Sequence, residues 1–288
     1  MGFSMRNLFL AGSIISASAL LSGCSFLGIG GSHDYRSHHG HAAHGHMQHA
    51  PAHTTCSSQS CLSRWNLEGG LGPAFAVGGD AVTGSRTNDG TGAAIRTISM
   101  QDAYETGYRA ELGTSYALSP NTKVSLMGHY AEADSEGVID WGTVDGEALR
   151  GQLSDYESYG AELGLRHYFQ PRRGIILNSV RPYVEGRAGV AKLNNVNIEN
   201  VTLGGDAFNA GAPVPFYESG VVGTAAGLVG VETPLTRYST IGIETGIRYS
   251  GKPDTDTSAL GPGNPLGGIN NGGDQWTVPL MLRGRYRF

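Results

Sequence analysis

The sequence has no excess of positive charge. Its 20 lysine and arginine residues face 25 aspartate and glutamate residues, which gives a formal net charge of -5 and a pI near 6.0. A domain that binds nucleic acid usually carries a basic patch that neutralises phosphates. The composition therefore argues against nucleic acid as a partner.

Long apolar runs are also missing. The longest, residues 8–21, follows Arg6 and is shorter than the roughly 20 residues that a helix needs to cross a bilayer. A basic residue followed by a short apolar run is typical of a secretory signal peptide. The next residues, Leu21-Ser22-Gly23-Cys24, resemble the lipobox of bacterial lipoproteins. That resemblance implies that residues 1–23 are removed and that Cys24 is lipidated; the alternative is an ordinary signal peptide with a chance cysteine.

Residues 24–63 have no apolar periodicity and are rich in His, Gly, Ala and Ser. We interpret them as a flexible periplasmic linker. Imidazoles bind Zn, Cu or Ni, but an unfolded tract offers them no fixed geometry, so only weak metal binding is expected and no cofactor. A tether whose charge rises in acid is the alternative. The histidines of this tract are His33, His38, His39, His41, His44, His46, His49 and His53.

Cysteine is scarce, with three residues in the whole chain. Cys56 and Cys61 lie close together in "CSSQSC", at the end of the linker. In an oxidising compartment two such cysteines most simply form a disulfide with a small loop. A metal cluster of cysteine and histidine is the alternative.

Glycine is abundant, at 45 residues, and eight segments after residue 64 alternate apolar and polar residues. In "YETGYRAELGTSYAL", Tyr104, Tyr108 and Leu112 share one side and Arg109 and Glu111 share the other. A period of two predicts β-strands. Long and short connections alternate between the segments, which places the long connections at one end. Even strand number, strands of about ten residues and aromatics near strand ends are typical of a transmembrane β-barrel.

Charged residues follow the polar side of these segments. The interior of an eight-stranded barrel is just wide enough to be filled by side chains, and opposite charges can pair there. An arginine facing lipid at the bilayer midplane would cost roughly 2–4 kcal/mol. The charged side of each strand is therefore expected to face the barrel interior and the apolar side to face lipid. We expect an interior network of Glu68, Arg109, Glu111, Glu162, Arg166, Glu185, Arg187, Glu244, Arg248, Arg283 and Arg285.

Residues 64–288 resemble the small outer-membrane barrels typified by the OmpA transmembrane domain, and the closing "RGRYRF" resembles the C-terminal strand signal of that class. The resemblance implies an all-β, eight-stranded antiparallel up-and-down barrel in the outer membrane of a Gram-negative bacterium. It implies outer-membrane lipids and lipopolysaccharide as neighbours, and the barrel-assembly machinery as a partner that reads Tyr286 and Phe288.

The expected function is structural or surface interaction, through four long extracellular loops held by a plugged barrel. We expect the third and fourth loops, rich in Gly, Asn and Pro, to be flexible or to form contact surfaces. The alternatives are a narrow porin-like channel and metal capture by the histidine tract. An enzyme is not expected, because neither of the two remaining histidines, His129 and His167, has a serine neighbour on the same side of its strand.

Overall fold

The computed structural model describes residues 64–86, 92–169, 180–207, 212–256, 258 and 268–288. All of them belong to one compact unit, Thr54–Phe288. Apart from one short helix, α2 (Met100–Ala103), their regular structure is β-strand. No helix among the described residues is long and apolar enough to cross a membrane. The predicted signal peptide, the linker, Cys24, Cys56, Cys61 and the eight tract histidines lie outside these residues.

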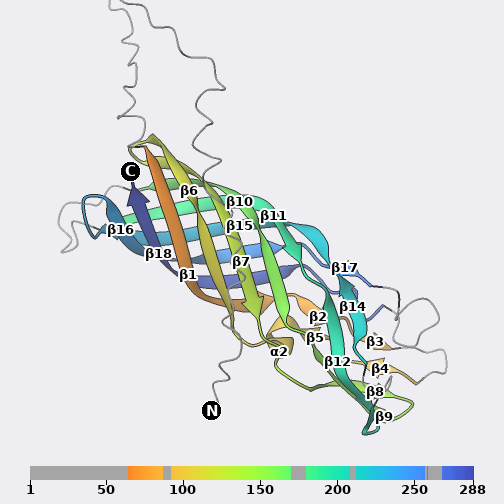
Figure 1. Ribbon diagram of the computed structural model, residues 1–288. Coiled ribbons are helices and arrows are strands. Elements are labelled where there is room, and N and C mark those ends of the chain that lie inside the picture. Colours follow the sequence, from red (N-terminus) through yellow and green to blue (C-terminus); the bar gives the residue numbers. More distant parts are fainter. Residues whose placement is uncertain (1–63, 87–91, 170–179, 208–211, 257, 259–267) are drawn as a thin grey trace, which may run out of the picture. The chain divides into compact units, whose positions relative to one another are not determined.

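Eight long strands form a closed antiparallel barrel (Figure 1). Sequence neighbours pair around the ring, and β1 closes it by pairing with both β6 and β18. The predicted all-β, up-and-down, eight-stranded fold is therefore confirmed. The strands are β1 (Trp65–Gly78), β6 (Gly107–Ser119), β7 (Thr122–Ala133), β10 (Tyr156–Tyr168), β11 (Arg181–Leu193), β15 (Gly220–Pro234), β16 (Ser239–Ser250) and β18 (Gln275–Arg287).

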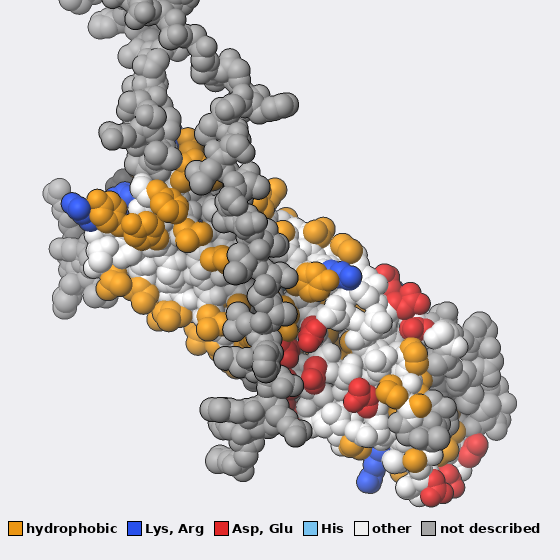
Figure 2. Space-filling view, viewed as in Figure 1, with side chains coloured by type: hydrophobic (Ala, Val, Ile, Leu, Met, Phe, Trp, Pro, Cys, Tyr) orange, Lys and Arg blue, Asp and Glu red, His pale blue; other side chains and the backbone are white. Residues whose placement is uncertain are grey.

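Successive residues of each barrel strand face opposite sides of the wall. Leu112 and Leu163 lie on the outer face and are 65% and 63% exposed, whereas their sequence neighbours Glu111 and Glu162 lie inside and are 5% and 2% exposed. Figure 2 shows apolar side chains gathered over the barrel strands. A continuous apolar outer face is unfavourable in water and suits a hydrocarbon environment.

Aromatic side chains gather at both ends of the outer face. At the short-turn end, Trp65 packs on Tyr116 with ring centroids 5.0 Å apart, and Tyr286 packs on Phe288 at 5.5 Å. At the opposite end, the ring pairs are Tyr108 with Tyr130 and Tyr249 with Trp276. Two such girdles are typical of barrels whose ends lie at the two membrane–water interfaces.

All four long connections contribute strands to a second sheet, which we call the distal sheet. It runs in the order β17, β14, β12, β9, β8, β4, β3, with β13 paired to β12. Two of its hairpins have two-residue turns, Asp145–Gly146 and Gly204–Gly205. All four turn residues have the positive φ that such tight turns require. The strands are β3 (Ser85–Arg86), β4 (Ala94–Ile95), β8 (Ile139–Val144), β9 (Glu147–Leu153), β12 (Val196–Leu203), β13 (Asp206–Ala207), β14 (Val214–Glu218) and β17 (Asp254–Thr255); β2 (Asp80–Val82) pairs separately with β5 (Ile98–Ser99).

The distal sheet has a hydrophobic core of its own. Val82, Trp141, Phe216 and Ile269 come one from each long connection and are at most 1% exposed. The rings of Trp141 and Phe216 meet edge to face, with centroids 5.7 Å apart. Partly buried residues at the ends of the barrel strands pack against the same core. The sheet is therefore folded onto the barrel rim.

Two expectations from the sequence are corrected by this sheet. The third long connection was expected to be flexible or to form a contact surface. The flexible alternative is wrong for its described part, because β12, β13 and β14 occupy it. Tyr104, predicted on the outer face of a barrel strand, is instead 5% exposed and packs in the distal core. The physical reason in both cases is burial of apolar residues that the barrel itself does not use.

Truncation of Phe216 tests whether the distal sheet holds itself together. Phe216→Ala should destabilise the sheet by about 3–5 kcal/mol, because it removes a fully buried ring. We expect faster protease cleavage between residues 134 and 155 in folded protein, with the mobility of the unboiled barrel on SDS gels unchanged. Val138→Ala, at a 55% exposed position, is the control. Equal cleavage rates for the two variants would show that no such core forms.

Candidate functional site

A network of paired charges fills the barrel from one end towards the other. Six arginines and six glutamates take part, and each has at least one partner of opposite charge within 4.0 Å. The structure places all eleven predicted interior residues in this network. Glu232 is the twelfth member, and it was not predicted from the sequence.

Glu111 of β6 lies at the centre of the network. Its two carboxylate oxygens contact four guanidinium groups, those of Arg109, Arg187, Arg248 and Arg283, at 2.6–2.8 Å. One negative charge cannot neutralise four positive ones. The same arginines therefore also contact other carboxylates around Glu111; for example, Arg248 reaches Glu162 at 2.8 Å.

Tyrosines extend the network to the short-turn end. Arg166 contacts Glu68 at 2.9 Å and Glu185 at 2.7 Å, and its Nη1 donates to the hydroxyl of Tyr168. Arg285 donates to the same hydroxyl and pairs with Glu232 at 2.6 Å. The hydrogen-bonded chain is therefore continuous from the centre of the barrel to its mouth.

Glycine on the inner face makes room for these large side chains. A Cβ at Gly164 would lie 2.6 Å from a carboxylate oxygen of Glu185 and 3.1 Å from Cγ of Arg187. The first distance is shorter than real Cβ atoms show, and the second is tighter than most Cβ contacts. A larger residue at this position would therefore push Glu185 and Arg187 out of their present positions.

A small cavity of about 70 Å³ lies in the lumen between the network and the distal sheet. Arg109, His129, Glu162 and Arg248 are among its lining residues. His129 Nδ1, Arg248 Nε and Thr224 Oγ1 also belong to this lining and have no hydrogen-bond partner among the described residues. The cavity has room for roughly two water molecules, which could satisfy these atoms.

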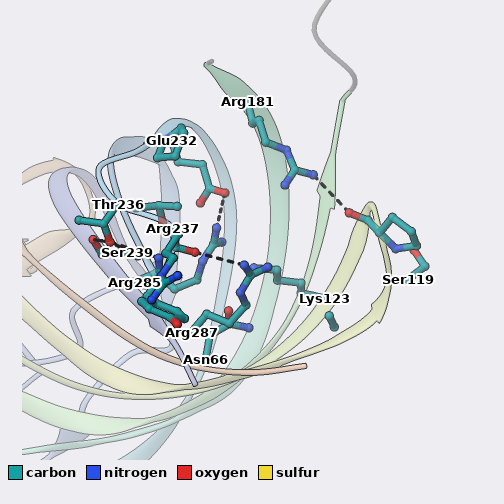
Figure 3. Close-up of a pocket in the computed structure, with 15 residues that line it drawn as sticks. Asn66, Ser119, Lys123, Arg181, Glu232, Thr236, Arg237, Ser239, Arg285 and Arg287 are labelled. Atoms are coloured by element: carbon teal, nitrogen blue, oxygen red, sulfur yellow. Dashed lines mark hydrogen bonds and ion pairs between the residues drawn. The ribbon is translucent and has the colours of Figure 1, made fainter. Parts of the chain in front are cut away.

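A larger cavity, of about 620 Å³, opens at the short-turn end of the barrel (Figure 3). It is lined by the ends of barrel strands and by the turn at residues 235–238. Figure 3 shows that its charged side chains come from several strands around the mouth. They are Lys123, Arg181, Glu232, Arg237, Arg285 and Arg287.

Comparison with known proteins finds similarity to solved structures alone, since neither a protein-family model nor a curated sequence matches. Neisserial surface protein A is 11% identical with a TM-score of 0.43, over 78% of this chain and 98% of that one. Ail of Yersinia pestis, solved with a heparin analogue, is 14% identical with a TM-score of 0.35, over 78% and 99%. The outer membrane protease OmpT of Escherichia coli is 10% identical with a TM-score of 0.41, over 78% and 96%. The barrel assignment rests on the closed strand order of this chain itself.

The two histidines of the barrel have different surroundings. His129 is 7% exposed inside the lumen, and no serine, threonine or cysteine hydrogen-bonds to it among the described residues. His167 lies on the outer face near the short-turn end, where its Nδ1 is 3.3 Å from the hydroxyl of Thr122 and its ring packs on Phe169. The described part of the chain thus contains no hydroxyl–histidine–carboxylate set.

The carboxylates of the second long connection are spread over separate hydrogen bonds. Asp155 accepts from the backbone of Ser135, and Asp140 accepts from that of Gly142. Glu157, at the start of β10, accepts from Asn194. Burial raises the pKa of Asp134, and the neighbouring carboxylates raise it further. Within the described ranges, no group of three or more His, Cys, Asp or Glu residues could hold a metal ion.

Tyr286 and Phe288, the predicted assembly signal, lie on the outer face at the short-turn end and are 48% and 60% exposed. Their role in assembly stays a prediction. Glu232 was missed because β15 is rich in glycine and alanine, so the alternation of apolar and polar residues in it is weak. Glu232 nevertheless lies an even number of residues after Leu228, which faces inward, so both face the same side of the strand. Strict counting along "LVGVE" would have found it.

Neutralising Glu111 tests the network. Glu111→Gln leaves four buried arginines short of one counter-charge, so it should destabilise the barrel by about 3–5 kcal/mol. The measurement is the urea midpoint of unfolding from lipid vesicles, followed by tryptophan fluorescence. Glu136→Gln, at an exposed position of the second long connection, should leave the midpoint unchanged. An unchanged midpoint for Glu111→Gln would contradict the network.

Proposed function

We propose that this protein spans the outer membrane of a Gram-negative bacterium and acts on its surroundings through the distal sheet. Two features support the location: the apolar outer face of the barrel and the aromatic girdles at both of its ends. Lipids and lipopolysaccharide would be the direct neighbours of that face. The barrel-assembly machinery would be the partner that inserts the chain.

The observation that carries the proposal is the distal sheet itself. All four long connections join in one folded sheet with a buried core, a construction that a pore does not need. Figure 2 shows acidic side chains on the surface towards this end of the molecule. Folded elements held on a rigid scaffold are well suited to binding a partner. We therefore infer a non-catalytic protein of surface interaction.

The paired charges support a plugged barrel over a channel. An ion crossing the lumen would have to pass Glu111 and Arg187, which are buried and paired at 2.7 Å. Displacing buried partners costs several kcal/mol. A narrow channel is the second candidate. Metal capture by the histidine tract stays a prediction, because that tract lies outside the described residues.

Surface display can be tested with one epitope tag at each end of the barrel. A tag inserted between Asp145 and Gly146, in the hairpin of the distal sheet, should bind antibody on intact cells. A tag inserted after Arg237, in the short turn at residues 235–238, should bind only after the outer membrane is permeabilised. A difference in mobility between unboiled and boiled protein on SDS gels checks that each tagged chain folds. The reverse pattern of antibody binding would contradict the proposal.

The plug can be tested by conductance in planar bilayers. Protein folded into lipid should give no step currents, because the paired charges block the lumen. Steps that change size in Arg166→Gln would instead support the channel. The matched variant is Arg150→Gln, which changes an exposed arginine of the distal sheet and should not affect any such current.

A further inference from the structure

The mouth cavity at the short-turn end carries unneutralised positive charge, in contrast to the paired interior. Five of its lining residues are cationic, and one, Glu232, is acidic. Glu232 is already paired with Arg285. Among the described residues, no carboxylate lies within 4.0 Å of the other four cations, which are Lys123, Arg181, Arg237 and Arg287.

Neutral groups contact all four of these cations, and the Arg237 guanidinium lies over the ring of Tyr238. Arg181 donates to the carbonyl of Pro120 at 3.2 Å and stacks over the ring of Tyr168. Arg287 donates to the carbonyl of Arg237 at 3.2 Å, and Lys123 lies 5.2 Å from the centre of the Tyr168 ring. Carbonyl and ring contacts orient a cation without cancelling its charge. The side chains are thus positioned with donors to spare.

The shape of the site strengthens their effect. The cations come from β7, β11, β18 and the turn at residues 235–238, so they surround the cavity (Figure 3). Its volume of about 620 Å³ lies within the range of small-molecule pockets, roughly 300–1,000 Å³. A concave site lined by one sign of charge concentrates the potential and attracts counter-ions.

We propose that this mouth binds a phosphate-bearing anion, either a soluble phosphate compound or the headgroup of a phospholipid. A phosphate monoester or diphosphate brings more than one negative charge and several acceptor oxygens, which match several arginine forks at once. A single carboxylate would pair with only one of these arginines. The site lies at the opposite end of the barrel from the distal sheet and meets the paired network only through Glu232 and Arg285. It gives the short-turn end of the barrel a binding role.

The test for a soluble ligand is a calorimetric titration of the full-length protein, folded in zwitterionic detergent, with inorganic pyrophosphate in a chloride buffer of low salt. We expect saturable binding to one site per chain. The double variant Arg181→Gln and Arg237→Gln should bind about tenfold more weakly or worse, since it loses two charge-assisted contacts. The matched control, Arg150→Gln, should keep the affinity of the unchanged protein. A difference in mobility between unboiled and boiled protein on SDS gels checks that all three chains are folded.

The test for a lipid uses the same three proteins in phosphatidylcholine nanodiscs with and without phosphatidic acid. The readout is the amount of phosphatidic acid that stays with each protein. Pyrophosphate binding that the double variant loses supports a soluble phosphate compound, and enrichment of phosphatidic acid that it loses supports a lipid headgroup. Equal behaviour of the double variant and the unchanged protein in both tests, or no saturable binding in either, would overturn the proposal.

Discussion

The structure depends on one constraint: each charged side chain in the middle of the barrel must meet an opposite charge there. Six arginines and six glutamates satisfy it across seven of the eight barrel strands, with Glu111 shared by four arginines. Because the partners of Glu111 lie on different strands, a slip of one residue in any of those strands would turn a charge outward and break several pairs. Such a network is weak evidence of net stability. Its stronger contribution is to specify the register and to decide which face of each strand meets lipid.

The two ends of the barrel follow from this interior. Since the lumen is filled by paired side chains, binding has to occur at the ends. One end carries the distal sheet, whose core comes from all four long connections. The other end carries a mouth in which four cations have no carboxylate partner among the described residues. A balanced interior therefore separates an acidic, folded surface from a basic, concave one.

The barrel was predictable from the sequence, and the distal sheet was only partly so. Charges such as Glu111 and Arg109 alternate with apolar residues such as Leu112, so parity alone predicts which of them face inward. Tyr104 shows the limit, because its parity fits a lipid-facing strand while its ring is buried in another core. The turn pairs Asp145–Gly146 and Gly204–Gly205 were local signals of hairpins that could have been used. The pairing of β9 with β12, by contrast, joins different connections and leaves no local signal in the chain. The mouth is equally non-local, since Lys123 and Arg237 are far apart in sequence.

The central claim, that the apolar face of the strands meets lipid and the charged face meets the lumen, is tested most directly by the surroundings of Leu163. A nitroxide attached at Leu163→Cys, in a chain with Cys24, Cys56 and Cys61 changed to serine and folded into vesicles, reports those surroundings by its relaxation. We predict strong relaxation by oxygen, which concentrates in lipid, and weak relaxation by a water-soluble nickel complex. A label at Val138→Cys, in the distal sheet region, should show the opposite. A label at Leu163 that responds to nickel as strongly as the one at Val138 would mean that water covers the apolar face, and the membrane-spanning barrel would be wrong.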